Sequence, residues 1–224
     1  MPLSKNHPFI IAIDGPNASG KGTLSRRLST EFNFPSLDTG LLYRAVGWLV
    51  LDHGGDVESE KDAIRAADAL HTMIGKSPIL SNPDLRKVEI GRAASIVSTY
   101  PSVRQSLFDL QRGFALNPPN NAMGAILDGR DIGTVICPDA DVKFFVIADP
   151  EIRAERRAKE LHGDNWKDYY DQILIQTSER DRRDSERVTA PLKPADDAIL
   201  LDTTYMTAEE VFQKAVSYIR PLRE

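Results

Sequence analysis

The stretch from Phe9 to Leu28, FIIAIDGPNASGKGTLSRRL, decides the fold of this chain. Its apolar start is typical of a buried strand, and a glycine-rich turn and a helical pattern follow without a spacer. Gly15, Gly20 and Lys21 have the G-x-x-x-x-G-K spacing of a phosphate-binding loop. Such a loop surrounds phosphate oxygens with backbone N–H groups and ends on a helix N-terminus, whose dipole favours anions. The stretch therefore predicts a strand, a phosphate-binding loop and a helix over 21–32.

The whole loop is expected to bind the phosphates of a nucleoside triphosphate. Its expected binding residues are Gly15, Pro16, Asn17, Ala18, Ser19, Gly20, Lys21, Gly22 and Thr23. Where many such loops carry Ser or Thr directly after the lysine, this chain has Gly22, and the hydroxyl comes one residue later at Thr23. We therefore expect Mg²⁺ to be held largely by phosphates and water, with Thr23 reaching it through water. The alternative, a glycine-rich turn that merely caps a helix, fits the strand–loop–helix context less well.

The composition limits the class of protein. The chain has 224 residues, 41% of them hydrophobic and 27% charged, as in soluble globular proteins. A net charge of -5 argues against broad binding to nucleic acid. The chain has a single cysteine, Cys137, which excludes an internal disulfide and is expected to be half-buried. Without a long apolar run or a signal-peptide core, we expect a cytoplasmic protein that binds no membrane.

Strand-like and helix-like segments alternate along the chain. Expected strands cover 10–13, 34–38, 122–127, 142–148 and 198–201; expected helices cover 21–32, 39–52, 59–73, 86–98, 101–114, 151–161, 164–186 and 207–219. The segment 75–83 is expected to be a loop or small hairpin, and 164–186 a long solvated helix or helical hairpin. Val88 is a candidate core residue. Apolar strands without polar alternation are covered on both faces, which predicts a doubly wound α/β fold with a parallel sheet of about five strands.

A phosphate-binding loop alone is compatible with regulatory GTPases, motor ATPases and kinases of small metabolites. The chain lacks the N-K-x-D motif of a GTPase and is short for a motor. It instead places nine arginines at expected strand and helix ends: Arg44, Arg104, Arg130, Arg153, Arg157, Arg180, Arg182, Arg183 and Arg187. Phosphoryl transfer between two bound phosphates needs mainly charge stabilisation, which arginines supply. The pattern therefore favours a kinase, although any single arginine could equally lie on a solvated helix face.

Three features of the later sequence fit such a reaction. Arg153 and Arg157 are one helical turn apart, so both can point toward the loop end of the sheet. Asp128 ends an apolar strand, where a carboxylate can bind the water shell of Mg²⁺, although it could also form a turn. The charged segment 164–186 is suited to a lid that excludes water from the activated triphosphate.

Five blocks spread along the chain resemble the bacterial type of the cytidylate kinase family. They are 11–23 IAIDGPNASGKGT, 37–45 LDTGLLYRA, 93–107 AASIVSTYPSVRQSL, 127–145 LDGRDIGTVICPDADVKFF and 180–204 RDRRDSERVTAPLKPADDAILLDTT. The resemblance implies transfer of phosphate from ATP to CMP or dCMP with Mg²⁺. It also implies one kinase domain, with a core of 1–38, 118–160 and 188–224, a monophosphate-binding subdomain over 39–117 and a lid over 161–187. The segment 73–88 is shorter than the corresponding insertion of other members. A monomer is expected.

The resemblance assigns roles to individual residues. Thr39 and Arg44 would hold the monophosphate, Asp184 the ribose and Arg187 a phosphate, and the cytosine pocket would consist of Ser95, Arg104, Arg130 and Asp131. The expected catalytic residues are Lys21, Arg153, Arg157 and Arg187. A carboxylate suits the exocyclic amine of cytosine, whereas uracil would present a carbonyl and leave acceptors unpaired. The preference among CMP, dCMP and UMP stays open. So do a kinase of another small acceptor, such as shikimate or gluconate, and a nucleotide-binding module without turnover.

Overall fold

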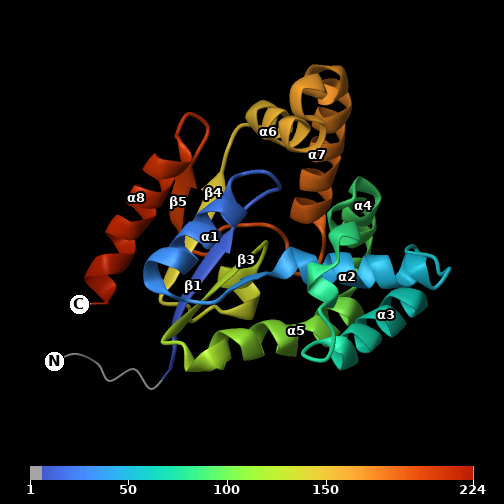
Figure 1. The fold of residues 1–224 in the computed structure, drawn as a ribbon, viewed down its shortest axis with the longest axis horizontal. Coiled ribbons are helices and arrows are strands. Elements are labelled where there is room, and N and C mark those ends of the chain that lie inside the picture. Colours follow the sequence, from blue (N-terminus) through green and yellow to red (C-terminus); the bar gives the residue numbers. More distant parts are fainter. Residues whose placement is uncertain (1–6, 224) are drawn as a thin grey trace. The chain divides into compact units, whose positions relative to one another are not determined.

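A computed structural model describes residues 7–223 of the chain. Its central feature is a five-stranded sheet in the order β2-β3-β1-β4-β5 (Figure 1). The strands are β1 (Phe9–Asp14), β2 (Ser36–Asp38), β3 (Gly124–Gly129), β4 (Val142–Ile147) and β5 (Ile199–Asp202). β1 pairs in parallel with β3 and β4, and β4 in parallel with β5. This confirms the α/β fold with a parallel sheet that the sequence predicts.

β1 lies at the centre of the sheet, and its four residues from Ile10 to Ile13 are at most 1% exposed. Consecutive residues of a strand point to opposite faces, so both faces of β1 are covered. β3 begins and ends two residues later than predicted, because its ladder with β1 continues to the pair Asp14–Gly129. Asp128 thus lies inside β3, and the polar turn begins with Arg130.

One face of the sheet is covered by α1 (Lys21–Phe32) and α8 (Ala208–Ile219), whose side chains share one core cluster with the strands. Its members include Leu24, Leu28, Ile126, Phe144, Leu201, Phe212 and Ile219. α8 begins with a capping box in which Thr207 and Glu210 bind each other's backbone N–H groups. Local capping and apolar burial thus agree on the position of this helix.

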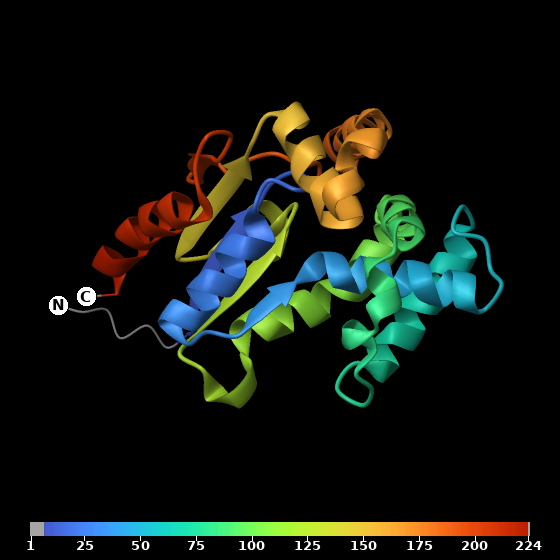
Figure 2. The same cartoon turned by 45° about the horizontal axis from the view of Figure 1, so that its top comes forward.

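The charged segment expected as a lid forms a helical layer with the helix before it (Figure 2). α6 (Pro150–His162) leads into a 3-10 turn over Gly163–Tyr169 and then into α7 (Tyr170–Glu186). Ala154, Ala158 and Ile173 form a small core between α6 and α7. The segment is therefore not solvated all round, since one face of α7 packs on α6.

Contact density divides the chain into two compact units. One runs through Leu37 and resumes at Ala115, and the other covers Asp38–Phe114. The second unit contains α2 (Thr39–Asp52), α3 (Glu60–Met73), α4 (Val88–Val97) and most of α5 (Pro101–Leu116). α2 packs against α3 and α4, and Gly47 lets α2 approach α4 closely, because a Cβ there would lie 2.8 Å from the Ala93 Cβ.

Three details differ from the sequence predictions. The segment 75–83 is a loop, the first of the two predicted alternatives, and the sequence did not predict the 3-10 turns Ile79–Ser81 and Pro83–Arg86 in this part of the chain. Val88 is 45% exposed rather than in the core, because it starts α4 on the side opposite Ile90, Ala93 and Val97. Cys137 is fully buried rather than half-buried; it directly follows the wide helical turn over Ile132–Ile136, and its N–H donates to the Ile132 carbonyl.

No helix within residues 7–223 is both long enough and apolar enough to cross a membrane.

Candidate active site

The loop after β1 has the backbone of a phosphate-binding site. Gly15 and Gly20 have φ angles of 148° and 99°, which residues with side chains rarely adopt. Gly20 directly precedes α1, so the helix N-terminus opens into the loop. The Lys21 ammonium group donates to the Pro16 carbonyl at 2.7 Å. The Ser19 hydroxyl is buried without a hydrogen-bond partner among the described residues, so it can donate to a phosphate oxygen.

Gly15→Ala is predicted to abolish measurable ATP binding and to lower the melting temperature by several degrees. A Cβ at this position would lie 2.0 Å from the Val146 carbonyl oxygen, in a backbone conformation that also strains alanine. Thermal unfolding and calorimetric titration with ATP measure both effects. Gly113→Ala is the matched control, because a Cβ there meets nothing within 4 Å. Normal ATP affinity in the Gly15 variant would contradict the prediction.

The turn after β5 is hydrogen-bonded to the phosphate-binding loop. The Thr203 hydroxyl lies 3.0 Å from the Ser19 carbonyl, and the Arg156 guanidinium donates to the Thr203 carbonyl at 2.6 Å. Sequence reasoning missed both residues. The position of Thr203 directly after a strand was the available signal, because the carboxyl ends of parallel strands share one edge of the sheet.

The two arginines of α6 have different surroundings. Arg153 is buried; its Nε donates to the Ala148 carbonyl at 2.8 Å, and it contacts the Asn17 carbonyl of the loop at 3.3 Å. Its Nη2 also pairs with Asp181 of α7 at 2.6 Å. Arg157 pairs with Glu160 of its own helix at 2.8 Å. The structure thus places Arg153 against the loop, while contact of Arg157 with a phosphate stays a prediction.

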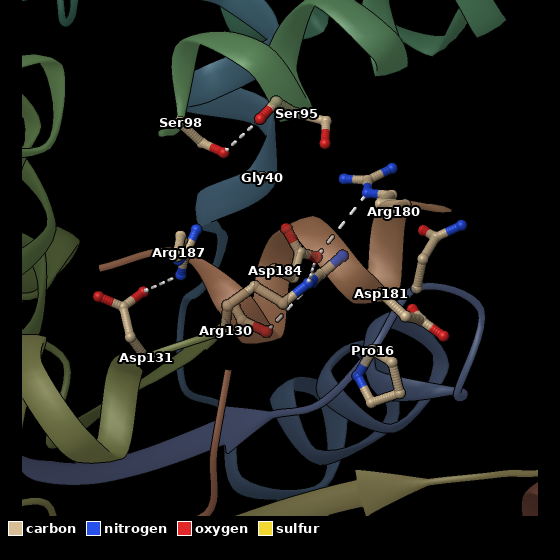
Figure 3. Close-up of polar contacts among 12 residues, drawn as sticks. Pro16, Gly40, Ser95, Ser98, Arg130, Asp131, Arg180, Asp181, Asp184 and Arg187 are labelled. Atoms are coloured by element: carbon tan, nitrogen blue, oxygen red, sulfur yellow. Dashed lines mark hydrogen bonds and ion pairs between the residues drawn. The ribbon is translucent and has the colours of Figure 1, made fainter. Parts of the chain in front are cut away.

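Four predicted acceptor residues of the first unit form two ion pairs (Figure 3). The Arg130 Nε lies 2.9 Å from Asp184 Oδ2, and Arg187 Nη2 lies 3.8 Å from Asp131 Oδ1. Arg180, one turn before Asp184, is 4.0 Å from the same carboxylate. Burial raises the pKa of Asp184, but Arg130, Arg180 and Arg187 outweigh this and hold the pKa below its ordinary value. Asp184 therefore stays ionised among these arginines.

A buried carboxylate that sequence reasoning missed lies where β1 meets the loop. Asp14 is 4% exposed, and its two oxygens accept the N–H groups of Ile132 and Gly133 at 2.8 and 2.7 Å. Burial raises the pKa of Asp14 to about 6, against these two hydrogen bonds. Its place at the end of a buried strand, the feature that singled out Asp128, could have identified it.

The metal prediction concerns Asp128 and Thr23. Asp128 is buried in β3 beside Ile13 of β1 and offers the oxygen chemistry that Mg²⁺ prefers. The Thr23 hydroxyl is exposed and accepts from Arg26 at 3.3 Å, which is a poor setting for direct ligation. Within residues 7–223, no group of three or more His, Cys, Asp or Glu side chains is arranged to hold a metal ion. These residues fit a metal carried mainly by phosphates and water.

The remaining predicted residues lie in the second unit. Thr39 and Ser95 are buried, each about 3% exposed. Arg44 donates to the carbonyls of Leu85 and Lys87 at 2.7 and 3.3 Å, so its guanidinium is held at the start of α4. Arg104 donates to the Ser98 carbonyl at 3.3 Å and stacks over the Tyr43 ring at 5.4 Å. Backbone contacts thus fix both arginines.

A phosphate-binding loop after the central strand of a parallel sheet, beside an arginine-rich helical layer, defines a P-loop kinase. A family model described as cytidylate kinase matches residues 11–221. Curated cytidylate kinases from Methylocella silvestris and Rhodospirillum rubrum are 53% and 50% identical, covering 93% and 94% of this chain and 92% and 97% of their own length. The chain therefore belongs to the cytidylate kinase family, whose members are ATP-dependent nucleoside monophosphate kinases.

The fold also matches a solved structure of low sequence similarity. The crystal structure of an uncharacterized protein from Eubacterium ventriosum superimposes with a TM-score of 0.52 at 15% identity, covering 95% of this chain and 98% of the other. At this level of identity the match shows a shared fold only.

Proposed function

We propose that the protein transfers the γ-phosphoryl group of ATP to CMP or dCMP, giving ADP and CDP or dCDP. The observation that carries the proposal is that a chain of the cytidylate kinase family forms two neighbouring-residue ion pairs, Arg130–Asp184 and Asp131–Arg187. These charges provide a carboxylate for the cytosine amine and arginines for the acceptor phosphate. Thr39, Arg44, Ser95 and Arg104 of the second unit are each also proposed to bind the acceptor nucleotide.

The proposed reaction requires positioning and charge stabilisation. A phosphate oxygen of CMP attacks the γ-phosphorus, and the bond from the γ-phosphorus to the bridging oxygen breaks, leaving ADP. The attacking oxygen is already ionised, so no general base is needed. Lys21 and the Ser19 hydroxyl stabilise the donor phosphates, and Arg153, Arg157 and Arg187 are proposed to stabilise charge on the transferred group.

Mg²⁺ is the proposed metal, and when bound it neutralises charge on the β- and γ-phosphates. Asp128 would contact its water shell, and ligation by Thr23 stays a prediction. We also propose a cytoplasmic enzyme that acts as a monomer, as the sequence predicts.

Asp131→Ala is predicted to lower kcat/KM for CMP by about 100-fold and to lower it much less for UMP. A pocket that hydrogen-bonds the cytosine amine discriminates strongly, because the wrong base leaves buried polar groups unpaired. ADP release with CMP, dCMP, UMP and AMP measures the base preference. Glu31→Gln is the control, since Glu31 forms a surface ion pair with Arg220 at 2.8 Å, at the end of α1 away from the phosphate-binding loop.

Two results would contradict the proposed function. If the wild-type protein turns over CMP no faster than the other monophosphates, CMP is not the acceptor. If ATP binds but no monophosphate stimulates ADP formation, the protein is a nucleotide-binding module.

A further inference from the structure

We propose that Asp14 is a positioning residue for base recognition. Asp14 lies at the end of the strand that leads into the phosphate-binding loop, and it holds the turn that follows Arg130 and Asp131 against this strand. The inference deepens the proposed function and rests on it, because it takes Asp131 to read the cytosine base. Asp14 then links the acceptor-reading turn directly to the strand that leads into the donor loop.

The first argument is the geometry of the carboxylate. Asp14 is the last residue of β1 and directly precedes Gly15, the first residue of the loop. Its Oδ1 accepts the Ile132 N–H at 2.8 Å, and its Oδ2 accepts the Gly133 N–H at 2.7 Å. These are the two amides that directly follow Asp131. A carboxylate that accepts two consecutive amides, one on each oxygen, restricts the orientation of the turn.

The second argument is the backbone of Asp131. Its carbonyl accepts the N–H groups of Val135 and Ile136 at 2.9 and 3.2 Å, which closes the wide helical turn over Ile132–Ile136. The first N–H groups of a helical turn have no partner within it. Asp14 accepts two of these N–H groups. The backbone of Asp131 is therefore held on both sides of its peptide group: its carbonyl accepts N–H groups of the turn, and the two amides that follow it donate to Asp14.

The third argument is the cost of placing a carboxylate there. Besides the two amides, Asp131 and Lys21 are the charged groups that act on Asp14; Asp131 disfavours its ionisation and Lys21 favours it. The aliphatic part of Lys143 packs on Gly133 at the same point. An apolar side chain would avoid the desolvation of a carboxylate, but it would leave two buried N–H groups unpaired.

Asp14→Asn tests the proposal with little change of volume. An amide offers one acceptor and one NH₂ group, so one of the two N–H groups must face another donor. We expect the KM for CMP to rise by about 10-fold or more, and the preference for CMP over UMP to fall, while the KM for ATP changes by less than about 2-fold. A purely structural role would lower stability without separating the two KM values.

Asp141→Asn is the matched control. Asp141 also accepts a backbone N–H of β1, that of Ile10 at 2.8 Å, but at the opposite end of the strand. It should leave both KM values unchanged. Gly133→Ala is a second variant that perturbs the same contact from the other side, because its Cβ would lie 3.4 Å from Asp14 Oδ2 and 3.1 Å from Lys143 Cδ. It should also raise the KM for CMP.

The outcomes separate this inference from the proposed function. An unchanged KM for CMP in a folded Asp14→Asn protein, or equal rises in the two KM values, would overturn the positioning role. If Asp14→Asn does not fold, Gly133→Ala decides: an unchanged KM for CMP would overturn the role, and a selective rise would support it. If Asp131→Ala does not alter base preference, the proposed base recognition fails whatever the Asp14 variant does.

Discussion

Lys21→Ala is expected to lower kcat for CMP phosphorylation by about 1000-fold or more and to leave the protein folded. Lys21 is 6% exposed, and its ammonium group lies inside the loop, 2.7 Å from the Pro16 carbonyl. Alanine at this position removes a charge preorganised for the transferred phosphate. The stability of the fold should change little, because it depends on the apolar cluster that α1 and α8 form with the sheet.

Measurement of ADP release at saturating ATP and CMP gives kcat, and circular dichroism verifies the fold. Lys214→Ala is the control for loss of a lysine, since Lys214 is exposed on α8. A fall in kcat of less than about tenfold would show that the arginines stabilise the transferred charge without Lys21.

Asp184→Asn has the largest expected effect on stability. Its carboxylate is 6% exposed and faces Arg130 at 2.9 Å and Arg180 at 4.0 Å, so the amide leaves like charges without their counter-ion. Removing one partner of a buried ion pair costs about 3 kcal/mol of unfolding free energy or more, which corresponds to about 6–12 °C in melting temperature. Chemical denaturation measures the change.

The effect of Asp184→Asn depends on pH. Burial raises the pKa of Asp184, but Arg130, Arg180 and Arg187 outweigh it, and the folded pKa lies below the ordinary value of 3.8. The stabilisation is therefore fully present above about pH 4 and is lost as the pH falls through the lower, folded pKa. Wild type and variant should differ most at neutral pH and converge in acid.

Glu186→Gln on the same helix is the control for this pH series. Glu186 forms an exposed pair with Arg182 at 3.4 Å, so its replacement should change stability by less than about 0.5 kcal/mol. A difference between wild type and Asp184→Asn that is small at neutral pH would mean that Arg130 and Arg180 are stabilised by water rather than by Asp184.

The strand, loop and first helix could be predicted because their determinants lie within twenty residues of one another. Apolar periodicity locates the strand and the helix, and the spacing from Gly15 to Lys21 locates the loop between them. The parallel sheet follows from strands without polar alternation. The end of β3 could not be located in this way, because the ladder with β1, and not the composition of β3, decides how far the strand runs.

The sequence predicts which residues belong to the candidate site, but it does not predict which groups their side chains contact. Arg153 and Arg157 share a helix face, yet one contacts the loop carbonyl of Asn17 and the other Glu160. Helical spacing fixes the direction of a side chain and leaves its partner open. Asp14 was missed for a related reason: its partners are amides of residues 132 and 133, far along the chain. The catalytic and binding roles of the predicted residues stay predictions until the variants are measured.

The burial of Cys137 makes the enzyme suited to single-site labelling. It is the only cysteine in the sequence, and it is 0% exposed directly after the turn that follows Asp131. A thiol reagent applied to the folded protein therefore meets no accessible native target. A cysteine introduced at the exposed Ile175 of α7 would carry a fluorophore or spin label at one known place. Movement of the helical layer during nucleotide binding could then be recorded directly, without first removing a native residue.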